Sequence, residues 1–348
     1  SYSKYSYSNS MVNKVYLVTP RGFCAGVEMA IKALSWMLKI YDETIYCYHE
    51  IVHNKWIVNK FEGHNVVFVE DPSEIPKGAI VMLSAHGTSP DVENEFNKKA
   101  TLTINSVCPL VTKVHHEAKK YTDKGAQIIY VGHKGHDEAL GAIGVSPKNM
   151  HLVESINDVE DLNLKGETAL LAQTTLAISE WEPIMNHSKK IYPNLSMPRK
   201  SDLCNRQSAI VEILNKVNSV LVVGSDNSSN TKALVEMVRS NGCDAQRIEN
   251  VNDLNSLNLN GNIAITAGAS APDHLVFEII DNLNAKELIE FNHINEEEYF
   301  PLPKELRNNV KIISNFLEHF CIGDEYPQKT KGINNDRKWS ATEALNSL

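Results

Sequence analysis

The sequence predicts an α/β protein built on parallel sheets. Short β-branched runs alternate with segments whose apolar residues recur with a period of 3.6, the pattern of parallel strands covered by helices. The chain has 348 residues, 42% hydrophobic and 22% charged, so we expect more than one domain and no extended disorder. No apolar run approaches the roughly 20 residues that a membrane span needs.

The predicted strands are short, apolar and bounded by turn-forming residues. Strands of this kind fit the interior of a parallel sheet, where both faces are buried. In chain order they are Lys14–Val18, Thr44–Tyr48, Val66–Val69, Ile80–Leu83, Leu102–Ile104, Gln127–Val131, Ala169–Leu171, Val220–Val223 and Ile263–Thr266.

Three segments show helical spacing clearly, and each follows a cysteine. Their apolar positions fall on one helix face, as expected for helices that cover a sheet. They are Val27, Ala30, Ile31, Leu34, Met37 and Leu38 after Cys24; Val111, Val114, Ala118 and Tyr121 after Cys108; and Ile210, Ile213, Leu214 and Val217 after Cys204.

The position of these three cysteines indicates a shared site. A thiol at a helix N-terminus is stabilised as thiolate by free N–H groups and by the helix dipole. Cys24 and Cys108 are 84 residues apart, and Cys108 and Cys204 are 96 apart, which indicates three similar units that each supply one thiolate. We place them at residues 13–107, 108–203 and 204–292.

The other three cysteines, Cys47, Cys243 and Cys321, lack this context and are predicted to be bystanders. Six cysteines are too few for a disulfide scaffold in a chain of this length, so reduced thiols are expected. Three converging thiolates are typical of zinc or of an iron–sulfur cluster. Because a four-iron cluster normally has four cysteine ligands, three would leave one iron open to substrate.

The ends of the chain are predicted to lie outside these units. Residues 1–12 have no apolar signal segment and are interpreted as a disordered processing remnant. Residues 293–348 are interpreted as a C-terminal segment with an amphipathic run, Val310–Phe320, followed by a peripheral tail. The net charge of −9 argues against a nucleic-acid partner, and no membrane partner is expected.

The run His49-Glu50-Ile51-Val52-His53 matches the pattern of zinc proteases, which require both histidines on one helix face. A zinc-dependent hydrolase using His49, Glu50 and His53 is therefore one alternative. We favour a strand-to-helix turn, because the run follows a strand directly and the helical pattern begins around Asn54.

Polar clusters follow most of the predicted strands. Ligands bind beyond the carboxyl ends of strands in open α/β sheets, and hydroxyls and N–H groups there form anion sites. No nucleotide-binding glycine motif is present, so a small diphosphate is favoured over a nucleotide. The clusters contain His53 and Asn54; His86; His133, His136 and Glu138; Gln173, Thr174 and Thr175; Ser225 to Asn230; and Gly268 to Ser270.

These motifs, in this order, resemble those of the 4-hydroxy-3-methylbut-2-enyl diphosphate reductases (the LytB/IspH family) over about residues 13–307. The matching runs are Pro20–Val27, His49–Asn54, Ser84–Gly87, Cys108–His115, Gly132–Glu138, Gln173–Leu176, Asn227–Asn230, Ala267–Pro272 and Pro301–Arg307. The resemblance implies three α/β units in a pseudo-threefold trefoil around a [4Fe-4S] cluster held by Cys24, Cys108 and Cys204. Its open iron accepts the allylic hydroxyl, which leaves as water after transfer of two electrons and two protons. The products are isopentenyl and dimethylallyl diphosphate, at the last step of the methylerythritol phosphate pathway.

The same resemblance assigns roles to the polar clusters. Glu138 relays the proton, with Thr174 and His136 in contact with the substrate. The diphosphate is held by His53, His86, Ser228, Ser229, Asn230 and Ser270. Two departures stand out: the family carries about four more residues between Cys204 and Asn205, and Gly141-Ala142-Ile143-Gly144 replaces Gly-Thr-x-Gly.

The resemblance also implies a ferredoxin or flavodoxin-type electron donor. Together with the residues before Met11 and the Asn- and Lys-rich composition, it favours a plastid-type organelle such as an apicoplast, with bacterial cytoplasm as the alternative. A non-catalytic iron–sulfur sensor of a phosphorylated ligand remains a further alternative to an enzyme.

Overall fold

The computed structural model describes residues 12–197, 204–293, 296–320 and 336–348, without the side chains of residues 204, 205 and 317–320. The predicted remnant lies outside this part of the chain, except for Val12, which begins a strand. Cys321 and the side chain of Cys204 also lie outside it. Among the described residues, no helix combines the length and the apolarity needed to cross a bilayer.

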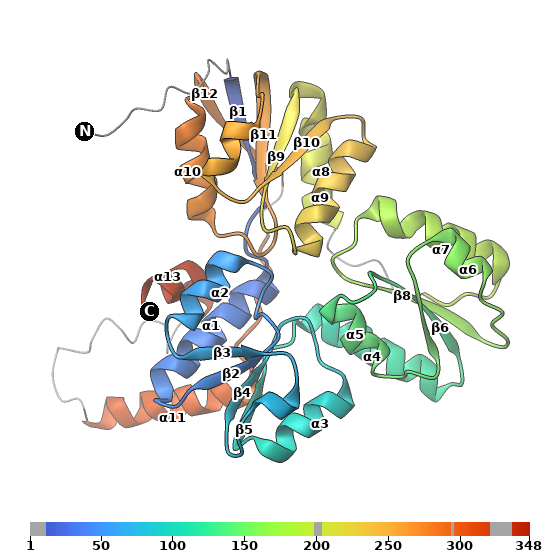
Figure 1. The fold of residues 1–348 in the computed structure, drawn as a ribbon, viewed down its shortest axis with the longest axis vertical. Coiled ribbons are helices and arrows are strands. Elements are labelled where there is room, and N and C mark those ends of the chain that lie inside the picture. Colours follow the sequence, from blue (N-terminus) through green and yellow to red (C-terminus); the bar gives the residue numbers. More distant parts are fainter. Residues whose placement is uncertain (1–11, 198–203, 294–295, 321–335) are drawn as a thin grey trace. The chain divides into compact units, whose positions relative to one another are not determined.

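The described residues contain twelve strands in three sheets, and every ladder between these strands is parallel. The predicted α/β class with parallel sheets is thereby confirmed (Figure 1). The strands are β1 (Val12–Thr19), β2 (Ile45–Tyr48), β3 (Val66–Val69), β4 (Ile80–Leu83), β5 (Leu102–Asn105), β6 (Gln127–Val131), β7 (Met150–Val153), β8 (Thr168–Ala172), β9 (Ser219–Val223), β10 (Asp244–Ile248), β11 (Gly261–Ala267) and β12 (Glu287–Asn292).

The helices follow the strands in chain order, as the sequence pattern predicts. Three begin at or directly after a cysteine: α1 after Cys24, α4 after Cys108 and α8 at Cys204. The helices are α1 (Ala25–Ile40), α2 (Lys55–Glu62), α3 (Pro90–Lys99), α4 (Pro109–Asp123), α5 (Asp137–Ile143), α6 (Ile156–Glu160), α7 (Ile178–Ile191), α8 (Cys204–Ile213), α9 (Ser229–Ser240), α10 (Asp273–Leu283), α11 (Lys304–Phe320) and α13 (Ala341–Asn346).

The chain divides into two compact units. The first contains Ser1–Cys24, Thr174–Pro183 and Arg199–Glu297, and the second contains the rest. Strand β1 belongs to the first unit rather than to the grouping of residues 13–107, because it pairs with both β11 and β12. The start of the chain therefore fills a gap in a sheet made otherwise from residues beyond 218.

The first unit has one sheet with strand order β10-β9-β11-β1-β12, covered on both faces. Alternate residues of a strand point to opposite faces, so Leu221 and Val223 pack with α10, whereas Val220 and Val222 pack with α8 and α9. These helices flank the sheet in Figure 1. Burial on both sides explains why β9 is apolar along almost its whole length.

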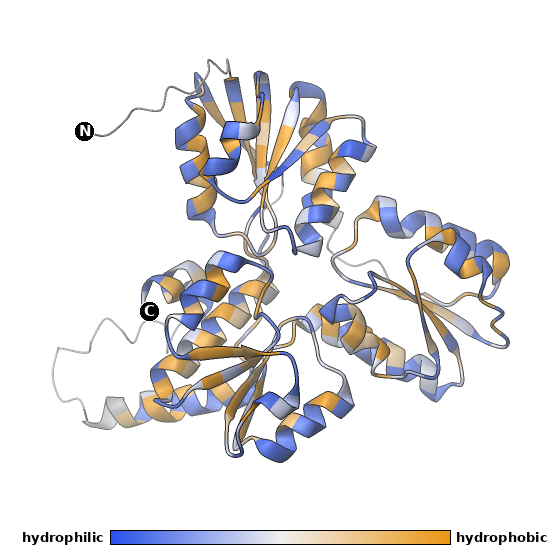
Figure 2. Ribbon diagram, in the orientation of Figure 1, coloured by the Kyte–Doolittle hydropathy of each residue, from blue (hydrophilic) through white to orange (hydrophobic). Residues whose placement is uncertain are grey.

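The second unit has two sheets, with strand orders β3-β2-β4-β5 and β7-β6-β8. Their strands are largely hydrophobic, while the helices around them alternate hydrophobic and hydrophilic residues (Figure 2). One core lies where Val81 and Leu83 of the larger sheet meet Phe96 of α3, and another lies around Ile128 and Tyr130 of the smaller sheet.

The C-terminal residues are not a peripheral tail, and that expectation was wrong for residues 336–348. Helix α13 packs on α1, with Ala341 and Leu345 buried. Polar contacts fix the same region: the buried Nζ of Lys32 lies 3.3 Å from Asp336 Oδ1, and the Ala341 N–H donates to Glu28 Oε2 at 2.7 Å. Helix α13 has six residues, which are too few to show a helical period in the sequence.

The packing of α13 gives a stability prediction. Leu345→Ala removes a side chain that is 2% exposed and leaves a cavity against α1, so we expect the free energy of unfolding to fall by about 2–3 kcal/mol. Leu288→Ala, at a leucine that is 48% exposed, is the matched control and should cost under about 1 kcal/mol. Chemical denaturation compares the two, and equal losses would contradict the assigned packing of α13.

The pH dependence of stability gives a second prediction, at His115 of α4. Burial, and then the neighbouring His116, lower the pKa of His115 to about 4. As pH falls below 6.5, the unfolded chain protonates this residue while the folded protein does not, so folding stability falls until about pH 4. His115→Gln should therefore lose about 1 kcal/mol less than the wild type between pH 7 and 5.5.

Denaturation curves at the two pH values measure this difference. His64→Gln, at an exposed histidine that follows α2, serves as the control and should keep the pH dependence of the wild type. An unchanged slope in His115→Gln would show that His115 titrates normally in the folded protein.

Candidate functional site

A group of histidines lies at the carboxyl ends of two neighbouring strands in the second unit. His49 and His53 follow β2, and His86 follows β4, which pairs with β2. The rings of His53 and His86 are stacked, with centroids 4.0 Å apart. His49 has a φ of 59°, an unusual value for a residue other than glycine, and its Nδ1 lies 2.7 Å from Glu70 Oε2.

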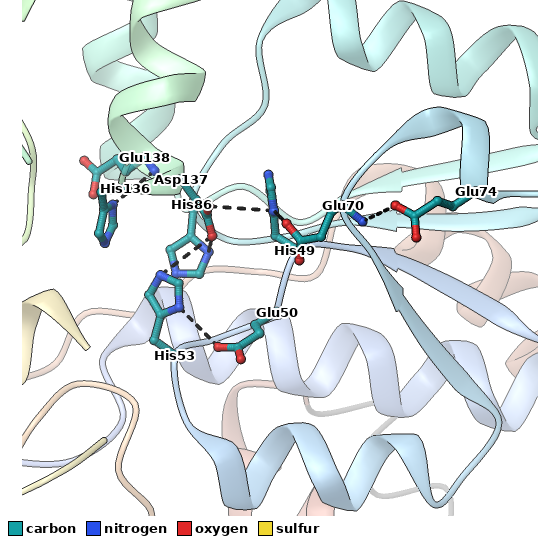
Figure 3. Close-up of polar contacts among 9 residues, drawn as sticks. All are labelled: His49, Glu50, His53, Glu70, Glu74, His86, His136, Asp137 and Glu138. Carbon is teal, nitrogen blue, oxygen red and sulfur yellow. Dashed lines mark hydrogen bonds and ion pairs between the residues drawn. The ribbon is translucent and has the colours of Figure 1, made fainter. Parts of the chain in front are cut away.

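Helix α5 brings three more titratable residues to this group (Figure 3). His136 caps the helix, since its Nδ1 accepts from the Glu138 N–H at 3.2 Å. The His136 ring centroid lies 5.2 Å from that of His53 and 5.9 Å from that of His86. Glu138 is only 2% exposed. The structure therefore brings together four residues of the predicted site: His53, His86, His136 and Glu138.

Asp137, the first residue of α5, was missed by the sequence analysis and lies in the middle of the histidines. Its Oδ1 is 3.7 Å from His49 Nδ1, and its Oδ2 is 3.8 Å from His53 Nε2 and 4.0 Å from His86 Nδ1. Its position between His136 and Glu138, at a predicted helix start, was the only signal in the sequence. We name His49, His53, His86, His136 and Asp137 the histidine cluster.

Glycines allow α5 to come this close. A Cβ at Gly141 would lie 2.7 Å from the Gly87 carbonyl oxygen, and one at Gly144 would lie 2.2 Å from Ser89 Cβ. Gly87 itself has a φ of 88°, and a Cβ there would lie 2.8 Å from Val111. A side chain at Gly141 or Gly144 would separate α5 from the loop that carries His86, and one at Gly87 would push that loop away from α4.

Burial shifts the pKa values of two members of the histidine cluster, His86 and Asp137. Burial, and then three neighbouring histidines, lower the pKa of His86 well below its ordinary value, so this ring is neutral at neutral pH. Burial also raises the pKa of Asp137, and its histidine neighbours only partly oppose that shift. Burial thus disfavours the charged forms of both His86 and Asp137.

The structure does not form a zinc-protease helix from His49 to His53. These residues lie in a turn between β2 and α2, and Asn54 caps α2 by accepting from the Ile57 N–H at 3.1 Å. Glu50 contacts His53 itself, with Oε2 3.3 Å from Nδ1, rather than lying beside two histidines on one helix face. The strand-to-helix turn favoured by the sequence is confirmed.

Cys24 lies in the first unit, at the carboxyl end of β1. Its N–H donates to the Ala269 carbonyl at 3.2 Å, so it is tied to the loop after β11. Arg206 is 6% exposed and donates hydrogen bonds to the Gly22 and Phe23 carbonyls. It also forms a bidentate salt bridge with Glu296, in which each N–H···O distance is 2.7 Å. Burial alone would lower the pKa of Arg206, but Glu296 and Cys24 raise it.

Cys108 lies in the second unit as the N-cap residue of α4, with no side-chain capping bond. A Cβ at Gly26 would lie 2.7 Å from its sulfur, so only glycine permits α1 to pass there. Cys24 and Cys108 are partly accessible, whereas Cys47 is buried and burial raises the pKa of its thiol far above the ordinary value. Cys243, also a predicted bystander, is partly accessible as well, so accessibility alone does not separate the predicted ligands from the predicted bystanders.

The hydroxyl cluster of the first unit lies where α9 begins, beyond the carboxyl end of β9. Ser228 caps α9 by accepting from the Thr231 N–H at 3.3 Å, and Thr175 Oγ1 donates to Ser229 Oγ at 2.9 Å. Asn230 Oδ1 accepts from the Ala269 N–H at 2.7 Å, next to the buried Ser270. Ser228, Ser229, Asn230 and Ser270 therefore share one edge of the sheet, and Thr174 precedes Thr175 in the same unit.

Known proteins resemble this chain over most of its length. The family model described as "LytB protein" matches residues 15–284. The 4-hydroxy-3-methylbut-2-enyl diphosphate reductase of Cutibacterium acnes is 40% identical over 306 residues, which cover 84% of this chain and 95% of that protein. The protein of the same name from Buchnera aphidicola is 43% identical over 280 residues, covering 77% of this chain and 90% of the relative.

A solved structure agrees with these sequence matches. The E-1-hydroxy-2-methyl-but-2-enyl-4-diphosphate reductase from Plasmodium falciparum superimposes with a TM-score of 0.82 at 32% identity, covering 87% of this chain and 99% of that one. The family model, the sequence relatives and the solved structure each cover more than three quarters of the chain. The chain belongs to the LytB protein family.

Proposed function

We propose that this protein is an oxidoreductase that converts (E)-4-hydroxy-3-methylbut-2-enyl diphosphate to isopentenyl and dimethylallyl diphosphate. The reaction consumes two electrons and two protons and releases the allylic hydroxyl as water. The observation that carries the proposal is the buried carboxyl of Glu138 beside His136, in a chain whose relatives bear the name of this reductase. A buried carboxylic acid is suited to deliver a proton to a departing oxygen.

The cofactor that we propose is a [4Fe-4S] cluster held by Cys24, Cys108 and Cys204. The residues fit such a group: Cys24 and Cys108 are partly accessible, each helix begins at or directly after its cysteine, and Gly26 leaves room beside the Cys108 sulfur. Arg206 lies beside Cys24, which contributes to raising the pKa of the guanidinium. When bound, the cluster supplies low-potential electrons and Lewis acidity at an iron without a cysteine ligand.

The chain's own residues are proposed to bind and orient the substrate. Hydroxyls of Ser228, Ser229 and Ser270 and the amide of Asn230 donate to the diphosphate, with the N-terminus of α9 adding a favourable dipole. His53 and His86 contact the same group. Glu138, with His136 and Thr174 near the hydroxyl end, holds the proton that leaves with the oxygen.

The electron donor and the location follow from the same proposal. A ferredoxin or flavodoxin-type protein is the expected donor, because the reaction needs low-potential electrons. We propose a plastid-type organelle as the site of action, with bacterial cytoplasm as the alternative. Immunolocalisation in the source cell distinguishes the two.

The cysteine assignment predicts which substitutions remove iron. The wild-type protein, purified without oxygen, should contain about four irons with acid-labile sulfide. Cys24→Ser, Cys108→Ser and Cys204→Ser should each lose most of this iron, because each removes one of the three ligands. Iron and sulfide analysis with EPR of the reduced protein measures the loss.

The bystander cysteines provide controls for that experiment. Cys47→Ala and Cys243→Ser should keep the iron content and EPR spectrum of the wild type, since neither thiol begins a helix. A wild-type protein that contains zinc and no iron would overturn the cofactor proposal and favour a hydrolase.

The proton role of Glu138 predicts a selective loss of activity. Glu138→Gln keeps the shape of the side chain but cannot deliver a proton, so turnover with a low-potential donor should fall at least about 100-fold. The cluster EPR spectrum should not change. Glu62→Gln, at an exposed glutamate of α2, is the matched control and should keep wild-type turnover. Full activity in Glu138→Gln would remove it from the mechanism, and absence of turnover in the wild type would favour a non-catalytic sensor.

A further inference from the structure

Helix α1 is held by residues that lie beyond the part of the chain that the family model matches. That match ends at residue 284, whereas residues 336–348, which include α13, pack on α1 (Figure 1). Their contacts run along α1 from Glu28 in its first turn to Lys39 in its last turn, where Lys39 Nζ donates to the Ser347 carbonyl at 3.2 Å. We name residues 336–348 the C-terminal clasp.

Lys32 is the central polar contact between α1 and the C-terminal clasp. Its side chain is 3% exposed, and its Nζ donates to the Asp336 carbonyl at 2.9 Å and lies 3.3 Å from Asp336 Oδ1. The same ammonium lies 5.3 Å from the centre of the Tyr299 ring, and the Tyr299 hydroxyl donates to Asp336 Oδ2. A buried ammonium is costly without such partners. The clasp therefore supplies a counter-charge that α1 needs.

Apolar packing adds to this polar contact. The ring centroids of Trp36 and Trp339 are 5.2 Å apart, with the ring planes tilted by 50°, a favourable arrangement for an aromatic pair. On α13, Ala341, Ala344 and Leu345 are buried. The clasp is thus fixed to the middle of α1 by buried side chains of both kinds.

The clasp also contacts the first turn of α1, which begins directly after Cys24. Glu28 Oε2 accepts from the Ala341 N–H at 2.7 Å and so satisfies the first N–H of α13, which has no acceptor within its own helix. Burial raises the pKa of Glu28, and the Ala341 N–H, followed by Lys32, only partly opposes that shift. The carboxylate of Glu28 is therefore stabilised by its contact with the clasp.

The same turn of α1 contains the residue that packs on Cys108. A Cβ at Gly26 would lie 2.7 Å from Cys108 Sγ and 3.1 Å from Cys108 Cβ, so the α1 backbone covers one side of this thiol. Gly26 and Glu28 are two residues apart in one helical turn and move together. A contact that holds Glu28 therefore also limits the movement of Gly26 away from the sulfur.

We propose that the C-terminal clasp positions the first turn of α1 over Cys108, with Glu28 as its positioning residue. By holding Gly26 against the sulfur, the clasp slows the reaction of this thiol with solutes. It also slows the loss of an iron–sulfur cluster held by Cys108, a consequence that rests on the cofactor proposed above. Release of the clasp would expose the thiol without any change to a cysteine.

Alkylation of Cys108 in the cluster-free, reduced, full-length chain tests the clasp without reference to iron. Iodoacetamide is added, and the modified fraction of Cys108 is followed by peptide mass spectrometry. Glu28→Ala removes the acceptor of the Ala341 N–H, so Cys108 should react at least about fivefold faster than in the wild type. Glu28→Gln keeps an acceptor oxygen and should stay within about twofold of the wild type. The buried Cys47 is the internal reference and should stay unmodified in all variants.

Val159→Ala separates this effect from a general loss of stability. Val159 is fully buried in α6, which packs beside β7, so the substitution leaves a cavity and lowers the midpoint of chemical denaturation. Cys108 should nevertheless react as in the wild type. Equal rates in the wild type and Glu28→Ala, an equal increase in Val159→Ala, or a Glu28→Gln variant as reactive as Glu28→Ala would each overturn the proposal.

Iron loss extends the comparison to the cluster-loaded protein. Each variant is loaded without oxygen and mixed with an excess of an iron chelator, and the release of iron is followed over time. Glu28→Ala should lose iron at least about fivefold faster than the wild type, while Glu28→Gln and Val159→Ala stay within about twofold. Faster alkylation of Cys108 with unchanged iron loss would overturn the role of the clasp in cluster retention. A wild type that takes up no iron would overturn the proposed cofactor, and the alkylation rates would still decide whether the clasp covers Cys108.

Discussion

The close contact between α5 and the loop after β4 is the constraint on which the histidine cluster depends. Gly141 and Gly144 let the helix backbone approach that loop, and Gly87 lets the loop pass α4. The contact joins the smaller sheet of the second unit to the larger one, since α5 follows β6 and the loop follows β4. A methyl group at Gly141 would therefore do more than strain one turn: it would withdraw Asp137 from three histidines at once.

The groups that an anion would meet are set by local structure and not by the net charge of −9. In the first unit, neutral hydroxyls and the start of α9 provide donors that need no counter-charge. Next to Cys24, Arg206 is held by Glu296 and by two backbone carbonyls, so its positive charge stays in place when buried. In the second unit, burial lowers the pKa of His86 and raises that of Asp137, so it disfavours the charged form of each group. The two units thus offer an anion different chemistry.

Sequence patterns predicted all the interior strands of the described sheets but only half of the edge strands. Each strand predicted in advance is present, and most are flanked by neighbours that bury them. The three strands missed, β7, β10 and β12, are all at sheet edges. Edge strands such as Asp244–Ile248 are half exposed and mix polar with apolar residues, so they lack the continuous apolar run that identifies an interior strand. The sequence also did not predict which sheet contains β1. Its partners, β11 and β12, are more than 200 residues away in the sequence, and such pairing leaves no local pattern.

The sequence predicts those residues of the candidate site that lie in a recognisable local pattern. Cysteines at helix starts and polar residues after strands carry such signals, and the structure places Cys24, Cys108, His53 and His86 accordingly. Asp137 carries only a weak signal, which is its position at a predicted helix start between two residues that were already assigned. Successive helix residues point about 100° apart, so Asp137 and Glu138 cannot face the same group, and Figure 3 shows them turned apart. The start of α5, which His136 caps, places the Asp137 carboxyl among the histidines and leaves the buried Glu138 carboxyl on another side of the helix.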